Sequence, residues 1–176
     1  QPNTGVFISW RSYDSREGDA VERAKERDER LEELSDQFER AGRYAVARQM
    51  RPEFTSVDIR LEALLSVIEG DTPMIIDADG RREIEAAIVF CIERGLRPII
   101  YGGYDAPQCA DMLKKYDVPV IVHATYRLPR RRHDPFDYPY TLPKRLSDVG
   151  IRFAIAGSGT GAGGGASNAR NLPFHA

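Results

Sequence analysis

The sequence is poor in the residues that mark disulfide scaffolds and metal knuckles, and it has no long apolar run. It holds two cysteines and three histidines in 176 residues. Cys91 and Cys109 cannot form a disulfide framework or a metal knuckle, and Cys91, inside the run IVFCI, is expected to be a small buried group. No run approaches the roughly 20 apolar residues that span a bilayer, and no leader pattern is seen, so we predict neither a membrane span nor a signal peptide.

The chain also lacks an excess of charge of one sign. Its 25 basic and 27 acidic residues give a formal net charge of −2. A field this weak does not attract a nucleic acid or an anionic membrane, so neither partner is expected. The apolar content of 41% is enough for a chain of this length to bury a core, which excludes global disorder.

What the sequence does contain is a regular alternation of short apolar runs and helical patterns between residues 72 and 156. The apolar runs lie at residues 73–76, 98–101, 118–124 and 151–155, and helical patterns at residues 81–94, 105–117 and 144–149 separate them. This alternation is typical of a parallel sheet covered by helices. The predicted fold class is therefore α/β.

Polar or glycine residues follow most of the predicted strands, where parallel sheets and barrels place their chemistry. These strand ends hold Asp77, then Tyr101 with Gly102 and Gly103, then His123, and finally Ala156 with Gly157. Asp77 comes directly after PMII, and a carboxylate there needs a partner. Tyr101 can serve as packing or as a proton donor, and His123 can act as an acid, a base or a metal ligand.

The first part of the chain reads differently. Residues 1–14 have no periodicity and suggest an irregular lead-in, whereas residues 15–50 form a charge-dense pattern that predicts one long exposed helix with a possible break near Gly42. Arg51 precedes a proline and ends that helix. Ser56 or Asp58 can cap the next helix, which Gly70 stops. We therefore divide the chain into residues 1–52, lead-in and helix, and residues 53–176, the βα units.

Two aspartates and three arginines flank the predicted strand ends. Asp79 and Asp105 each precede a helix and are expected to be N-caps. Arg130, Arg131 and Arg132 lie in a long loop, and loops of this length in compact domains are usually lids or binding loops. The arginines could clamp a carboxylate or phosphate of a ligand, or they could pair with the nearby Asp134 and Asp137.

The glycine-rich stretch after the last strand matches G-x-G-x-x-A at Gly157, Gly159 and Ala162. Glycine is so frequent there that chance explains the match, and the acidic residue expected about 20 positions later has no counterpart. A flexible loop is the simpler interpretation. His133 and His175 have no partner at the spacing of a metal site.

From residue 57 to residue 176 the order of these pieces resembles the metal-dependent amidohydrolases, specifically the imidazolonepropionase-like branch. The carrying pieces are VDIRLEALLSVIEGDTPMIIDADGRREIEAAIVFCIERGLRPIIYGG, YDAPQCADMLKKYDVPVIV, LPRRRHDPFDYPYTLPKRLSDVGIRFAIA and NARNLPFHA. The resemblance implies a (β/α)8 TIM barrel, present here as a partial barrel with the family's fifth to eighth strands. It also implies that the first half of the barrel lies outside this sequence, and we expect the chain to be a segment or a processed product.

The metal chemistry of that family depends on residues that differ in this sequence. The resemblance implies a divalent metal such as zinc, held by a His-x-His pair on the first strand, by histidines after the fifth and sixth strands and by an aspartate after the eighth. No His-x-His occurs here, and the three later positions match Asp77, Tyr101 and Gly157. Asp77 is the candidate metal ligand that remains. Asn168 and Arg170 match the eighth loop and are candidates for substrate contact.

Two functions follow from the resemblance, and the glycine-rich stretch alone favours a third, a dinucleotide-binding α/β protein. The first is a hydrolase that acts on C–N bonds other than peptide bonds and in which a metal activates water. Its catalytic pocket would be lined by Asp77, Tyr101 and His123. Its substrate would be contacted by Arg130, Arg131, Asn168 and Arg170. The second is a catalytically inactive barrel homologue that binds a small molecule or a protein partner. The partner in the first case is a small-molecule substrate. The sequence does not decide between a monomer and an oligomer. Neither function fixes a compartment.

Overall fold

The computed structural model describes residues 5–10, 19–53, 56–123, 125 and 127–156 of the chain. These residues form one five-stranded sheet in which every neighbouring pair of strands is parallel and the spatial order follows the sequence. The strands are β1 (Val6–Ser9), β2 (Met74–Ala78), β3 (Pro98–Gly102), β4 (Val120–His123) and β5 (Phe153–Ala156). The expectation of an irregular lead-in is wrong at β1, which pairs with β2. The division of the chain at residue 52 stays a prediction.

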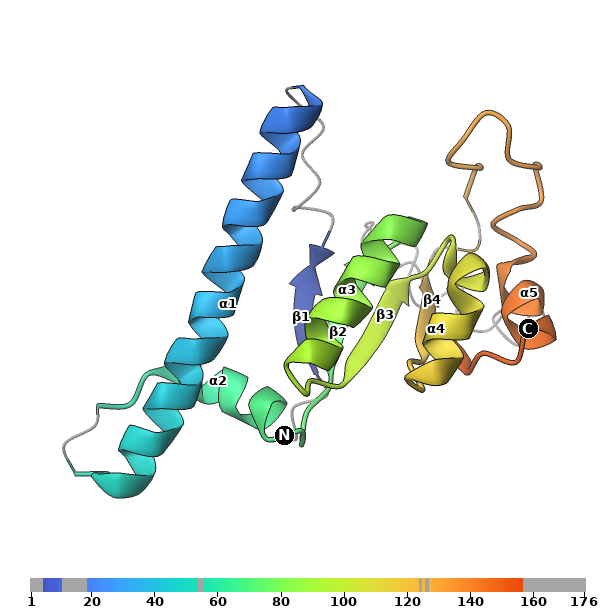
Figure 1. Cartoon of the computed structure of the whole chain (residues 1–176). Coiled ribbons are helices and arrows are strands. Elements are labelled where there is room, and N and C mark those ends of the chain that lie inside the picture. Colours follow the sequence, from blue (N-terminus) through green and yellow to red (C-terminus); the bar gives the residue numbers. More distant parts are fainter. Residues whose placement is uncertain (1–4, 11–18, 54–55, 124, 126, 157–176) are drawn as a thin grey trace, which may run out of the picture.

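The helices cross over between successive strands and lie on one side of the sheet (Figure 1). They are α1 (Ala20–Met50), α2 (Ile59–Ile68), α3 (Arg81–Glu93), the short 3-10 turn η2 (Ala106–Cys109) with α4 (Ala110–Lys115), and α5 (Leu142–Asp148). The predicted break of the first helix is wrong, because α1 runs through Gly42 without interruption. Among the described helices, none combines the length and the apolar character that crossing a membrane requires.

Residue chemistry explains where these helices begin and end. Asp58 caps α2 by accepting hydrogen bonds from the amides of Arg60 and Leu61, at 2.9 and 3.3 Å, which confirms one of the two predicted caps. Gly70 follows α2 with φ +80°, and Gly95 follows α3 with φ +67°. Only glycine adopts this left-handed conformation at low cost, so both positions stop a helix as predicted.

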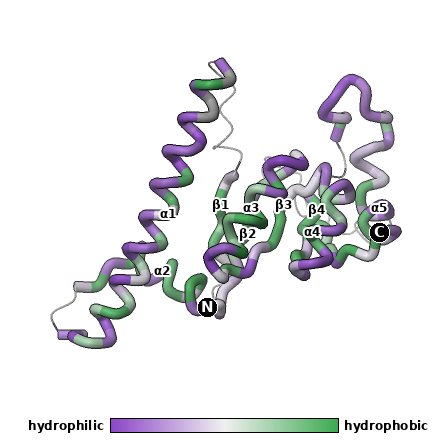
Figure 2. The backbone as a smooth tube through the Cα atoms, viewed as in Figure 1, coloured by the Kyte–Doolittle hydropathy of each residue, from purple (hydrophilic) through white to green (hydrophobic). Residues whose placement is uncertain are grey.

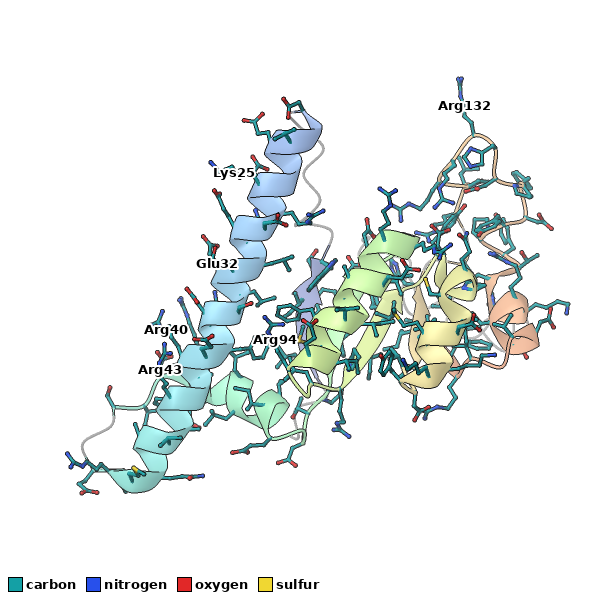
Figure 3. The ribbon with its side chains drawn as sticks, viewed as in Figure 1. Lys25, Glu32, Arg40, Arg43, Arg94 and Arg132 are labelled. Atoms are coloured by element: carbon teal, nitrogen blue, oxygen red, sulfur yellow. The ribbon has the colours of Figure 1, made fainter. Side chains whose placement is uncertain are left out.

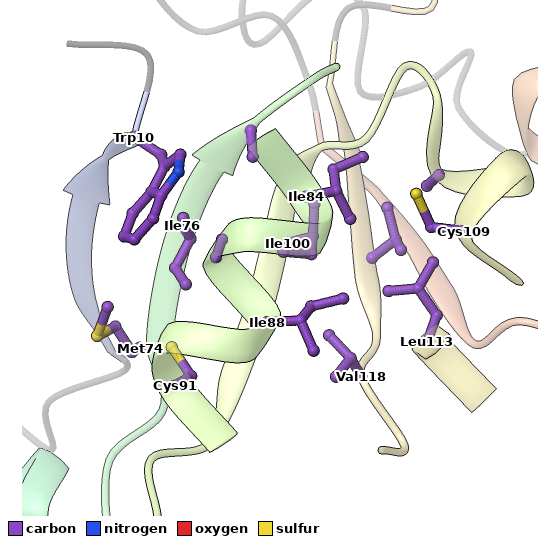
Figure 4. Packing of buried hydrophobic residues seen from close by; sticks show 14 of the residues in the cluster. Trp10, Met74, Ile76, Ile84, Ile88, Cys91, Ile100, Cys109, Leu113 and Val118 are labelled. Carbon is purple, nitrogen blue, oxygen red and sulfur yellow. The ribbon is translucent and has the colours of Figure 1, made fainter. Parts of the chain in front are cut away.

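The core lies between the sheet and its helices. Met74, Ile76 and Ala78 of β2 point into it, and they alternate with residues that point to the other face of the sheet. Figure 4 shows Ile84 and Ile88 of α3 packed over β2 and β3, with Cys91 among them. Hydrophobic residues gather in the strands and in α3, whereas the outer side of α1 is hydrophilic (Figure 2).

Both cysteines are free and buried, as expected for Cys91. Burial raises the pKa of the Cys91 thiol to about 12 and that of Cys109 to about 11. Because the thiolate is the reactive form, neither side chain is a nucleophile at neutral pH. The two cysteines therefore serve packing.

Candidate functional site

The face of the sheet opposite the helices carries the predicted catalytic residues in one row at the carboxyl ends of the strands. Ser9, Asp77 and Tyr101 are in register on β1, β2 and β3, and His123 follows on β4. Because side chains alternate along a strand, all four lie on the face away from Met74 and Ile76. Half-buried Asp77, Tyr101 and His123, distant in sequence, are thus brought together as the strand-end pattern suggested.

The rings of this row touch one another. The ring of Tyr101 stacks on that of His123, with centroids 4.9 Å apart and planes at 29°. The ring of Phe7 on β1 meets Tyr101 edge to face at 5.6 Å. These contacts fix the tyrosine between its neighbours and orient the imidazole. The row therefore offers one carboxylate, one phenol and one imidazole on adjacent strands.

The number of donors in this row decides whether it can hold a metal ion. Catalytic zinc sites use about three protein ligands of the histidine, cysteine or carboxylate type and leave one position open. No group of three such side chains close enough to hold a metal occurs in the part of the chain that the structure describes. Asp77 and His123 supply two donors from this row. The described residues therefore do not make a metal centre by themselves.

The two glycines after Tyr101 have a structural purpose. Gly102 and Gly103 have φ of +100° and +66°, a region that other residues enter at a cost. A Cβ at position 103 would lie 2.6 Å from Cγ1 of Val120, so a larger residue would clash with β4. This turn directs the next residue, Tyr104, back over the ends of β2 and β3.

Tyr104 lies at the centre of a cluster that closes the ends of β2 and β3. We call it the arginine cluster. Its residues come from the loop after β2, the loop after β3 and residues 127–141 of the β4–α5 loop. It consists of three arginines, three aspartates and the tyrosine: Arg127, Arg130, Arg131, Asp79, Asp105, Asp134 and Tyr104.

Asp79 is the deepest carboxylate of the cluster, with a side chain 0% exposed. It accepts a hydrogen bond from the Tyr104 amide at 3.2 Å and pairs with Arg127 at 3.3 Å and with Arg130 at 2.8 Å. Its predicted role as the N-cap of α3 is wrong. Gly80 is the N-cap, and Glu83 reaches back to accept from the amides of Asp79 and Gly80 at 3.0 and 2.9 Å.

The second half of the cluster binds Arg131. Its guanidinium pairs with Asp105 and lies 3.7 Å from a carboxylate oxygen of Asp134. Asp105 occupies the predicted N-cap position of η2, but its side chain makes no cap hydrogen bond there. Instead it accepts from the amide of Arg81, the first residue of the neighbouring helix α3. The Tyr104 hydroxyl donates to Asp134 at 2.7 Å and accepts from the Arg130 amide at 3.1 Å.

The predicted substrate residues divide between three places. Arg130 and Arg131 belong to the cluster, whereas Arg132 projects from the loop into solvent (Figure 3). Of the two local partners proposed for the arginines, the structure pairs Asp134 with Arg131, but it also adds the more distant Asp79 and Asp105. Asn168, Arg170, His175 and the glycine-rich stretch lie outside the described residues.

Sequence reasoning missed Arg127 and Tyr104. A signal for Tyr104 was available, because it directly follows a glycine pair at a strand end, where a backbone turn aims the next side chain over the sheet. Arg127 gave no signal, because one arginine in a loop of several arginines has no distinguishing pattern.

Comparison with solved structures gives one match that covers most of the chain. An amidohydrolase from Thermotoga maritima superposes on 89% of this chain with a TM-score of 0.68 and 20% sequence identity. The likeness shows the fold. The predicted class, α/β with a partial TIM-like barrel, is confirmed by this match and by the parallel sheet. No family model matches the sequence, and no curated protein matches it.

The match is unequal in length. It covers 42% of the amidohydrolase, so this chain spans less than half of that protein. In a closed barrel the face that carries Asp77, Tyr101 and His123 is the interior, and the carboxyl ends of the strands form the mouth. The row and the arginine cluster therefore lie at the end of the sheet where barrel enzymes bind their substrates.

Proposed function

We propose that this chain is part of an amidohydrolase-type barrel that hydrolyses a C–N bond, other than a peptide bond, in a small molecule. The observation that carries the proposal is the row of Asp77, Tyr101 and His123 on the inner face at the carboxyl ends of adjacent strands. The imidazolonepropionase-like branch is part of the proposal. It is supported by the order of the matching sequence pieces.

In this proposal each side chain of the row has one task. Asp77 accepts a proton from the water molecule that attacks the carbonyl carbon. Tyr101 donates a hydrogen bond to the carbonyl oxygen as negative charge develops there. His123 delivers a proton to the nitrogen that leaves when the C–N bond breaks. Arg130, Arg131, Asn168 and Arg170 stay proposed substrate contacts.

A divalent metal with Asp77 as a ligand also stays a proposal. Asp77 and His123 are fewer donors than a catalytic site requires, so further ligands would have to come from outside the described residues. The same shortage favours a second candidate function, an inactive barrel homologue that binds a small molecule or a protein partner. The two candidates differ in whether any bond is broken.

A hydrolysis assay on the Asp77→Ala variant separates them. We expect the complete barrel that contains this chain to release amine or open the ring of members of a panel of cyclic amides. In that protein Asp77→Ala should lower kcat/KM by at least about a hundredfold, the usual effect of losing a general base. Asp111→Ala, which removes an exposed carboxylate from α4, is the matched control. Metal content of both variants is measured in parallel.

The assay distinguishes the hydrolase from the binding homologue. Activity that falls with Asp77→Ala and not with Asp111→Ala supports the hydrolase, and stoichiometric zinc, iron or manganese lost with the same change supports Asp77 as a ligand. A folded protein that cleaves no member of the panel, or one whose activity is unchanged in Asp77→Ala, contradicts the assignment and favours the binding homologue.

A further inference from the structure

The arginine cluster has an uneven distribution of charge. Around Asp79 the described residues place two guanidinium groups, those of Arg127 and Arg130, against one carboxylate. Around Arg131 the ratio is reversed, since Asp105 and Asp134 face one guanidinium. Among the seven residues of the cluster, the end at Asp79 thus has one guanidinium group more than carboxylates, and the carboxylate of Glu83 lies beside it on the amides of Asp79 and Gly80.

The two guanidinium groups have more N–H donors than the carboxylate of Asp79 accepts. Oδ1 receives the Tyr104 amide and one nitrogen of Arg127 at 3.5 Å, and Oδ2 lies 3.3 Å from Arg127 and 2.8 Å from Arg130. Nε of Arg127 is buried and has no hydrogen-bond partner among the described residues. This nitrogen is enclosed, so an anion would contact the exposed parts of the two side chains and not Nε itself.

The same guanidinium groups remain reachable from solvent. The side chains of Arg127 and Arg130 are 21% and 30% exposed, whereas Asp79 beneath them is 0% exposed. Tyr104 holds both from one side, because their guanidinium carbons lie 4.9 and 5.9 Å from the centre of its ring. The arginines are thus fixed before any ligand arrives, and a small anion that binds them loses little to side-chain ordering.

We propose that Arg127 and Arg130 form a binding site for an anionic group with two or more oxygen acceptors, a carboxylate or a phosphate. Asp79 is the positioning residue of this site, and Tyr104 is the surface against which it is built. Planar guanidinium groups bind such oxygens in pairs, and their partial burial strengthens the bonds. The inference rests on the proposed function only in taking the anion to belong to a small-molecule ligand of the barrel.

Titration of the unmodified chain with inorganic phosphate, and separately with malonate, tests the site at constant ionic strength, because salt screens loose surface binding. We expect saturable shifts of the backbone amide signals of Tyr104, Arg127 and Arg130 in NMR spectra. The Tyr104 amide is a direct reporter, since it donates to Asp79. Saturation with one anion alone assigns the source as phosphate or carboxylate, and saturation with both supports the shared chemistry.

Two variants distinguish anion binding at this site from non-specific attraction to positive charge on the surface. Arg130→Gln removes one arginine of the pair and is expected to weaken binding about ten- to a hundredfold, the loss that one or two charge-assisted hydrogen bonds produce. Arg132→Gln removes an exposed arginine of the same loop and leaves binding unchanged. Thermal unfolding shows whether both variants are folded. The titration of the unmodified chain tests the proposal even if a variant does not fold.

The proposal is overturned by three results: no saturable shift at Tyr104 with either anion, shifts confined to exposed residues such as Arg132, or equal weakening in the two variants. None of these results bears on hydrolysis, which is measured through Asp77. Conversely, if phosphate or malonate binds through Arg130 but no amide is cleaved, the anion site is supported and the proposed hydrolase activity is contradicted.

Discussion

Asp134 is one of several residues that tie the β4–α5 loop to the ends of β2 and β3. Its side chain is 6% exposed and accepts the hydroxyl hydrogen of Tyr104 at 2.7 Å. Burial alone would raise the pKa of this carboxyl, but the hydrogen bond from Tyr104 and the charge of Arg131 outweigh it and hold the pKa below its usual 3.8. The folded protein therefore prefers the charged form more strongly than the unfolded chain does.

This preference makes a defined contribution to stability as a function of pH. A carboxyl with a lowered pKa in the folded state stabilises the protein above the unfolded value, and the contribution is lost as pH falls through the folded value. We expect the difference in the free energy of unfolding between the wild type and Asp134→Asn to be constant from pH 7 to about pH 5 and to shrink below that. Urea unfolding at a series of pH values measures it.

Asp111→Asn is the matched control for the removal of a negative charge, because Asp111 is exposed on α4. A difference for Asp134→Asn that stays constant down to pH 3, or that grows as pH falls, would show that the loop does not depend on this charged carboxylate.

Asp79 shows what a sequence pattern can and cannot predict at this scale. An aspartate just before a helix is usually an N-cap, and the local pattern contained nothing that argued otherwise. Arg127 and Arg130, whose loop packs over the end of β2, are 48 and 51 positions away in sequence. The nearby Glu83 takes over part of the capping, and this frees Asp79 for the arginines.

At the scale of elements, α1 is held from its middle to its C-terminal end. In its last third Tyr44 is buried, and its hydroxyl donates to Glu62 of α2 at 2.7 Å. Leu34, Phe38 and Ala41 are buried against the body of the protein, while Val21 near its beginning is 78% exposed. The ring of Phe38 meets that of Phe90 on α3 edge to face, with centroids 6.2 Å apart. The guanidinium carbon of Arg94 lies 3.9 Å from the centre of the Phe90 ring, and the same side chain donates a hydrogen bond to Ser35 of α1 at 2.7 Å. Figure 3 shows Arg94 between the two helices.

We expect Phe38→Ala to lower the free energy of unfolding by about 3 kcal/mol, because it removes a buried ring and leaves a cavity between α1 and α3. Val46→Ala, which shortens an exposed side chain of the same helix, should cost less than about 0.5 kcal/mol. Urea unfolding of the two variants measures both. Equal costs would mean that α1 does not depend on this contact.

The strands and helices after residue 58 were predictable because each has a strong local signal. Four apolar runs became β2 to β5, and the helical patterns between them became α3, α4 and α5 within a few residues. β1 was missed because a four-residue strand in an irregular setting has no measurable alternation. Its partner β2 lies some 68 residues further on, as the pairing of Val6 with Met74 shows, and no local rule reports that pairing.

At the scale of the whole molecule, the inner face of the sheet leaves apolar side chains of four neighbouring strands partly exposed. Phe7 on this face is 56% exposed, and Ile75, Ile99 and Ile121 on β2, β3 and β4 are half-buried. In a closed barrel these positions are packed interior. The alternation of side chains predicted which residues share this face, because it is a local property of each strand, whereas closing a barrel requires strands in addition to the five described here.

An exposed apolar face of this kind favours association of the 176-residue chain with itself when it is studied alone. We expect sedimentation to show a concentration-dependent oligomer, and Phe7→Lys to shift its dissociation to at least about tenfold higher protein concentration, because a charge on this face must be desolvated on association. Val21→Lys places the same charge on an exposed apolar position of α1 and should leave the equilibrium unchanged. A chain that stays monomeric at all concentrations, or two variants with the same effect, would mean that the inner face does not drive association.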